Sequence, residues 1–128
     1  MSVKRITKIV KNVSNKEVKV DKFIEKQVQL LVNKFADSRI KLDDVYVRFD
    51  TGKPDFFNKV VIIKDVLDTE QFRIIAGVYR TIDNKGYKRT YSGMGKNDLI
   101  RYLTSTQGLK EIKKDLGELL NKVVYMVD

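Results

Sequence analysis

The sequence predicts an α+β fold: an antiparallel sheet of about four strands, with helices packed on one face and the other face partly open. Segments in which apolar and polar residues alternate occupy the middle of the chain, and segments with apolar residues at helical spacing lie on either side of them. Turn-forming residues separate these segments. With 128 residues, no internal repeat and no Gly/Ser-rich linker, the chain is expected to form a single domain over residues 1–128.

The helical pattern occurs before and after the strands. Asp21 can cap a helix whose apolar stripe continues to Phe35, and this helix is expected to end near residues 36–38. A short helix is expected over residues 96–103, and a last helix beyond Gly108.

Two segments near the ends of the chain fit more than one structure. Residues 3–20 show both helical spacing and strand-like alternation, and residues 14–16 fit a hairpin turn as well as the start of a helix. We favour a strand followed by a helix. Residues 123–127 either end the last helix or add an edge strand.

Four segments in the middle carry the strand pattern. In the first, Val45, Val47 and Phe49 alternate with more polar residues. The other strands are expected over residues 59–66, 71–82 and 87–92, and the connecting turns over residues 51–54, 67–70 and 83–86.

The register of the last hairpin decides which side chains reach the open face. We expect residues 84–86 to form a three-residue loop with Gly86 at positive φ, so that Tyr79 pairs with Tyr91. This register places tyrosines and arginines on the face opposite the core: Arg73, Tyr79, Tyr87, Arg89 and Tyr91. On the first strand, Tyr46 and Arg48 also point away from their apolar neighbours. A shift by one residue would move the hairpin's side chains to the other face.

Tyrosine and arginine interleaved on an open sheet face suit single-stranded nucleic acid. Bases stack on the rings while guanidinium groups hold the phosphates. The formal charge of +9 also favours a polyanionic partner. Its excess lies in the N-terminal third, where we expect further phosphate contacts from Lys4, Arg5, Lys8 and Lys11. The same features have simpler explanations, because cross-strand Tyr–Arg pairs stabilise hairpins and charged runs keep proteins soluble.

The composition argues against an enzyme. The chain has no His and no Cys, and thus lacks the usual general base, the commonest zinc ligand and a thiolate nucleophile. Asp55 and residues 83–85 loosely match a metal-dependent nuclease, but residues 83–85 fall in an expected turn. We therefore predict no catalytic residue, no metal site and no cofactor. Apolar runs are too short to span a membrane, and a cytoplasmic location is expected.

A resemblance to a known family adds to this interpretation. The residues that carry it are Lys11-Asn12-Val13, Phe23-Ile24-Glu25-Lys26, Val45-Tyr46-Val47-Arg48, Val60-Val61-Ile62-Ile63 and the terminal helix over residues 109–116. In these residues, and in the order of one strand, a helix, three strands and a helix, the chain resembles the small ribosome-hibernation factors. The resemblance implies a basic cytoplasmic domain that binds ribosomal RNA near the decoding region. Here the chain departs from the family by inserting residues 15–20 before the helix and by a more basic last hairpin.

Taken together, these features predict a non-enzymatic nucleic-acid-binding protein, with RNA favoured over DNA and a regulatory role in gene expression or translation. Two alternatives remain open. One is a single-stranded DNA-binding accessory protein of a plasmid or phage. The other is a protein–protein interaction module, or an inhibitor, that docks on an acidic partner.

Overall fold

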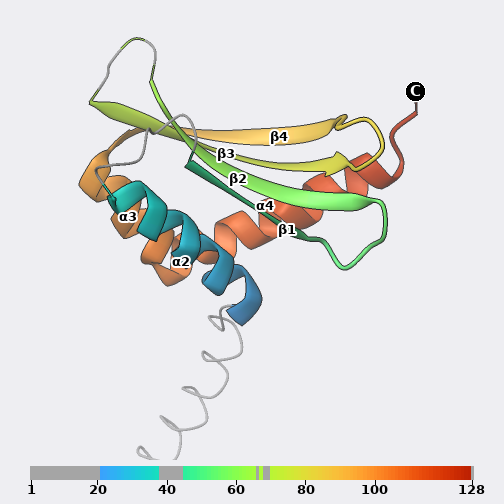
Figure 1. The fold of residues 1–128 in the computed structure, drawn as a ribbon, viewed down its shortest axis with the longest axis horizontal. Coiled ribbons are helices and arrows are strands. Elements are labelled where there is room, and N and C mark those ends of the chain that lie inside the picture. The colour runs from blue at the N-terminus through green and yellow to red at the C-terminus, as the bar shows by residue number, and fades with distance from the viewer. Residues whose placement is uncertain (1–20, 38–44, 66, 68–69, 128) are drawn as a thin grey trace, which may run out of the picture.

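Four strands form one antiparallel sheet in the computed structural model, which describes residues 21–37, 45–65, 67 and 70–127 (Figure 1). The strands, in the spatial order of the sheet, are β1 (Val45–Asp50), β2 (Phe56–Lys64), β3 (Gln71–Arg80) and β4 (Gly86–Gly95). Helix α2 (Lys22–Ala36) precedes the sheet, and α3 (Lys96–Thr104) and α4 (Thr106–Val124) follow it. The predicted α+β architecture is confirmed. None of the described helices has the length and apolar character needed to cross a membrane.

Helix α2 begins and ends where its sequence predicts. The Asp21 carboxylate accepts hydrogen bonds from the backbone N–H groups of Phe23 and Ile24, which have no partner inside the helix. Burial would raise the pKa of Asp21, but these two bonds and the nearby Lys113 hold the pKa below its ordinary value. The helix buries one apolar stripe, which includes Leu31 and Phe35.

The two C-terminal helices divide at Ser105, earlier than expected. The Ser105 hydroxyl caps α4 by accepting from the N–H of Gly108. Gly108 therefore lies inside the first turn of α4, where a Cβ atom would come within 2.0 Å of the Tyr102 carbonyl oxygen. This close approach lets α4 start directly beside the end of α3. Helix α4 then continues to Val124, so residues 123–127 add no strand.

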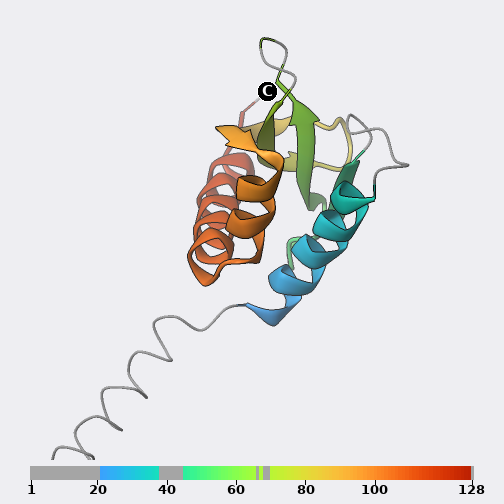
Figure 2. The same ribbon diagram turned by 90° about the vertical axis from the view of Figure 1, so that its left-hand side faces the viewer.

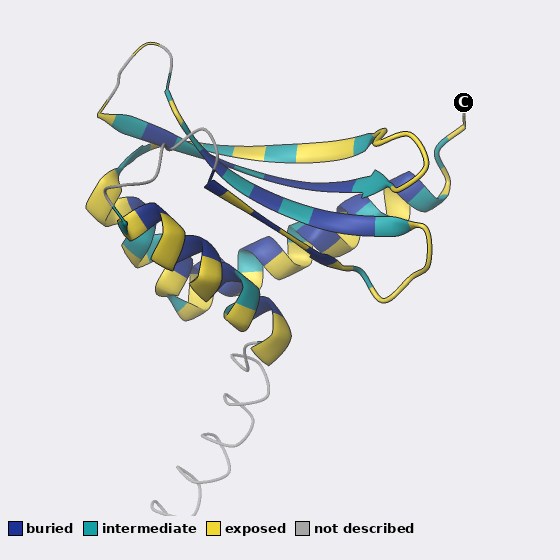
Figure 3. Ribbon diagram, in the orientation of Figure 1, coloured by how far each residue is buried: buried dark blue, intermediate teal, exposed yellow. Residues whose placement is uncertain are grey.

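All three helices lie on one face of the sheet, as Figures 1 and 2 show. Helix α2 contacts β1 and β2, while α4 contacts β3 and β4. Strand β1 alternates strictly between buried and exposed residues (Figure 3), and its buried residues Val45, Val47 and Phe49 belong to the core. No described helix covers the other face, which agrees with the prediction of a partly open sheet.

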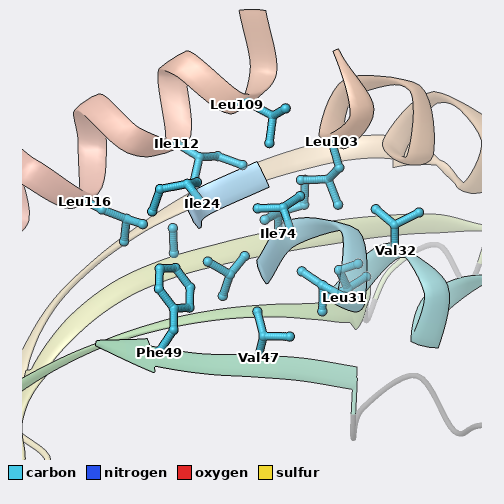
Figure 4. Packing of buried hydrophobic residues seen from close by; sticks show 14 of the residues in the cluster. Ile24, Leu31, Val32, Val47, Phe49, Ile74, Leu103, Leu109, Ile112 and Leu116 are labelled. Carbon is cyan, nitrogen blue, oxygen red and sulfur yellow. The ribbon is translucent and has the colours of Figure 1, made fainter. Parts of the chain in front are cut away.

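The core lies between the sheet and the helices. Ile24, Leu31, Val47, Phe49, Ile74, Leu103, Leu109, Ile112 and Leu116 are among its members (Figure 4). The apolar residues of β3 alternate as expected up to Val78, but Ile82 is exposed in the loop that follows Arg80. The expected strand and helix in residues 3–20 lie outside the described residues.

Candidate nucleic-acid interface

The hairpin of β3 and β4 has a different register from the one expected. Tyr91 pairs with Ile74, five positions earlier on β3 than Tyr79, and Arg89 and Tyr87 pair with Ala76 and Val78. These partners on β3 are buried residues of the core face. Because the difference is an odd number of residues, it moves Tyr87, Arg89 and Tyr91 to the face that the helices cover. Their expected position on the open face is wrong.

The loop between the two strands explains this register. The N–H of Arg80 donates to the carbonyl oxygen of Lys85, so the loop holds residues 81–84 and not 84–86. Asn84 takes the left-handed conformation (φ 60°), and the Asp83 carboxylate accepts from Lys85 N–H and from the Arg80 guanidinium. The bond with Arg80 is the main cause that lowers the pKa of Asp83. Asp83 and Asn84 thus form the turn, and Asn84 takes the positive φ that was expected of Gly86.

Gly86 has another role, as the first residue of β4. A Cβ atom there would come within 1.9 Å of the carbonyl oxygen of Val78. The glycine is therefore needed for the close approach of the two strands and not for a positive φ.

On the covered face, Arg89 and Tyr91 bind acidic residues of α4. The Arg89 guanidinium lies 2.5 Å from Asp115 and 3.0 Å from Glu118, and Tyr91 donates its hydroxyl hydrogen to Asp115. The bonds with Glu118 and Asp115 raise the pKa of Arg89, and burial together with Asp115 raises the pKa of Tyr91. These side chains attach β4 to α4, and the charge of Arg89 is already paired with two carboxylates.

The open face carries the other four expected residues on its strands: Tyr46, Arg48, Arg73 and Tyr79. Arg48 pairs across the strands with Lys59, and Tyr79 pairs with Phe57. We call the set Tyr46, Arg48, Phe57, Lys59 and Tyr79 the cation–aromatic face.

Sequence reasoning missed Phe57 and Lys59. Strand β2 was expected to begin at residue 59, whereas it begins at Phe56. Extending the alternation backwards from Val60 and Ile62, which point into the core, places Phe57, Lys59 and Val61 on the opposite face. This alternation was the available signal.

Ion pairing distinguishes the cations on the open face of the sheet. Arg73 is paired with Asp65 at 3.4 Å. Within the described residues, by contrast, no carboxylate forms a salt bridge with Arg48 or Lys59. Their charges are therefore available to an anionic ligand, while that of Arg73 is partly neutralised.

Each of these two cations lies against an aromatic ring. The Arg48 guanidinium is 3.6 Å from the centre of the Phe57 ring, and the Lys59 ammonium is 4.8 Å from the centre of the Tyr46 ring. Such cation–π contacts hold the side chains over the sheet without consuming their charge. The Tyr46 side chain remains accessible, because 45% of the residue's surface is exposed.

The residues of the cation–aromatic face, together with Asn84, line a shallow hollow of about 330 Å³. Tyr79 lies flat across β3, because its ring occupies the space above Gly77, where a Cβ atom would meet the Tyr79 hydroxyl oxygen at 2.3 Å. Its ring centre is 5.6 Å from that of Phe57. Partial burial raises the pKa of Tyr79 above its ordinary value of 10.0, so the hydroxyl is neutral at physiological pH. A flat, neutral ring beside unpaired cations is suited to stacking against a planar, anionic ligand.

The remaining expected site residues, Lys4, Arg5, Lys8 and Lys11, lie outside the described residues. Among the residues that the structure describes, no three acidic side chains gather closely enough to hold a metal ion.

The chain matches no protein-family model, no curated protein and no solved structure. The resemblance to the ribosome-hibernation factors stays a prediction.

Proposed function

We propose that the protein binds single-stranded nucleic acid, with RNA favoured, on the cation–aromatic face. The observation that supports this proposal is the arrangement of three aromatic rings and two cations without a carboxylate partner on a sheet face that no described helix covers. No catalytic step is part of the proposal.

The physical argument rests on the two parts of a nucleotide. Base stacking on an aromatic side chain contributes about 1–3 kcal/mol per base, and any base can stack because each has a π-face. Arg48 and Lys59 lie beside the rings, where they can contact the phosphates of stacked nucleotides. Arg48, whose guanidinium group is held 3.6 Å from the centre of the Phe57 ring, can also stack on a base itself.

Single strands fit this surface better than duplexes do. In a duplex the flat faces of the bases are covered by their neighbours, so Tyr46 and Tyr79 would have nothing to stack on. The preference for RNA rests on the resemblance described above, which also suggests a regulatory role in translation or gene expression in the cytoplasm. The plasmid or phage DNA-binding protein and the module for an acidic protein partner are the outcomes against which the proposal is tested.

The test is a fluorescence-anisotropy titration of the full chain with labelled single-stranded RNA, single-stranded DNA and duplex at two salt concentrations. We expect the single strands to bind more tightly than the duplex and the affinity to fall as salt rises. A higher affinity for DNA than for RNA would favour the accessory protein. Equal, weak affinity for all three would leave only a general attraction to the positive charge, and would contradict the proposed face.

Variants assign the binding to the face. Tyr46→Ala combined with Tyr79→Ala is expected to weaken single-strand binding at least tenfold, because two stacking contacts are lost. The control for a general attraction to positive charge is Lys110→Gln with Lys114→Gln. It removes two exposed lysines of α4 on the opposite side of the sheet. Thermal unfolding of each variant shows whether the fold is retained. A folded tyrosine variant that binds as tightly as the wild type would disprove the stacking role.

A further inference from the structure

We infer that a bound single strand continues past the edge of the sheet, crosses β1 beside Lys34 and follows the outer face of α2. This inference rests on the proposed function and extends it, because it assigns the path of the phosphate backbone beyond the cation–aromatic face.

Lys34 connects the two surfaces. It belongs to α2, in the helix layer, yet its ammonium group donates to the backbone carbonyl oxygen of Tyr46 on β1 at 3.2 Å. The same ammonium group lies 5.9 Å from the centre of the Tyr46 ring, which Lys59 approaches at 4.8 Å. Two ammonium groups from different layers therefore meet at one exposed ring. In the described part of the chain, no salt bridge neutralises either of them.

A row of exposed residues leads away from Lys34 along α2. Lys34, Leu30 and Lys26 follow one another at intervals of four residues, so their side chains lie one above the other on one face of the helix. Leu30 is 46% exposed, and within the described residues Lys26 forms no salt bridge. Lys22 continues the row, but it is paired with Glu25 at 3.2 Å. The available positive charge on this helix is therefore that of Lys26 and Lys34.

At the opposite edge of the sheet, exposed Lys88 of β4 lies on the open face, but the way from there onto the helix layer passes carboxylates. Strand β4 forms that edge, and its Arg89 is bound to Asp115 and Glu118 of α4. A phosphate backbone that crossed there would meet two carboxylates that already neutralise the nearest arginine. Charge complementarity thus favours the β1 edge, where Lys34 and Lys59 lie beside Tyr46. Figure 2 shows α2 at one side of the helix layer, with α3 and α4 at the other side.

The length of the row sets the number of nucleotides it can contact. Lys34 lies eight positions after Lys26, which corresponds to about 12 Å along a helix with a rise of about 1.5 Å per residue. At about 3.4 Å per stacked nucleotide, this distance accommodates about three or four nucleotides. A short oligonucleotide can therefore occupy the cation–aromatic face alone, whereas a longer one reaches α2.

The experiment compares a single-stranded RNA of about four nucleotides with one of about twelve, a span within the range of known single-strand sites. In the wild type, the longer RNA should bind more tightly than the shorter one. The difference in affinity should exceed the gain that its larger number of binding positions alone would give. Lys26→Gln should lower the affinity for the longer RNA about threefold to tenfold and change that for the shorter RNA less than twofold. Because one phosphate contact is lost, the slope of log affinity against log salt should decrease by about 0.7 for the longer RNA only.

Lys114→Gln is the matched control, since it removes one exposed lysine from the middle of α4. Equal losses for Lys26→Gln and Lys114→Gln with the longer RNA would overturn the α2 path and leave the sheet site intact. If the wild type binds neither RNA, the proposed function itself fails, and the inference falls with it. Circular dichroism of both variants shows that α2 and α4 are retained.

Discussion

The guanidinium group of Arg48 lies 3.6 Å from the centre of the Phe57 ring, on the sheet face that no described helix covers. Asp50 is the strand partner of Phe57, and Arg48 lies two residues earlier on the same strand, diagonal to the ring. Phe57 is buried although it points away from the core, and Arg48 is one of the side chains that cover it. The pair therefore places a positive charge directly over a buried aromatic ring.

Replacing Arg48 with Lys should weaken single-strand binding although the charge is kept. A lysine ammonium lacks the flat surface that stacks on Phe57 and on a base. A loss of about 1 kcal/mol, typical of an exposed cation–π contact, corresponds to roughly fivefold in affinity. Anisotropy titration measures this change, and Arg101→Lys in α3 serves as the matched control. Unchanged affinity of the Arg48 variant would show that the site uses only its charge.

Gly77→Ala should displace the Tyr79 ring without unfolding the protein. A Cβ atom at position 77 would lie 2.3–2.6 Å from three atoms of the Tyr79 side chain, which must move off the strand. The side chain is partly exposed and has room to turn, so we expect a stability loss of about 1 kcal/mol and a binding loss close to that of Tyr79→Ala.

A double-mutant cycle tests this relationship between Gly77 and Tyr79. In a Tyr79→Ala background, Gly77→Ala should have no further effect on affinity, because the ring that it displaces is already absent. Additive losses would mean that Gly77→Ala acts through the strand itself and not through the ring.

Tyr91→Phe should reduce stability and leave nucleic-acid affinity unchanged. The substitution removes the hydroxyl that donates to Asp115, and loss of one such hydrogen bond costs about 1 kcal/mol. Because Tyr91 lies on the covered face, no ligand contact is lost. Denaturant unfolding and anisotropy titration give the two values. A variant of normal stability with weakened binding would contradict the assignment of Tyr91 to the interior.

Asp21→Ala should destabilise α2 by about 1 kcal/mol at neutral pH, as is typical for loss of an N-cap. The pKa of Asp21 in the folded protein lies below its ordinary value of 3.8, so the carboxylate stabilises the fold above that pH. The difference in unfolding free energy between wild type and variant should therefore shrink as pH falls below 3.8. A difference that does not depend on pH over this range would assign the effect to packing and not to the charged cap.

Several elements of this fold are local properties of the sequence. The cap at Asp21 and the end of α2 after Ala36 follow from residues within a few positions of each other. The alternation of β1 and of β3 up to Val78 follows in the same way, and it correctly placed Tyr46, Arg48, Arg73 and Tyr79 on the open face. Periodicity alone is sufficient for such assignments, since a strand with one buried face has only two orientations.

The tertiary structure decided which of these residues lie together. The register of β4 depends on bonds made by Arg80, Asp83 and Asn84 in the loop, and so Arg89 and Tyr91 contact α4 and not a ligand. The meeting of Lys34 with Tyr46, twelve residues away on another element, arises only when α2 packs beside β1. Spacing along the chain predicts the direction of a side chain within its own element. Its neighbours on a surface depend on strand pairing and helix packing between distant segments, which no local pattern encodes.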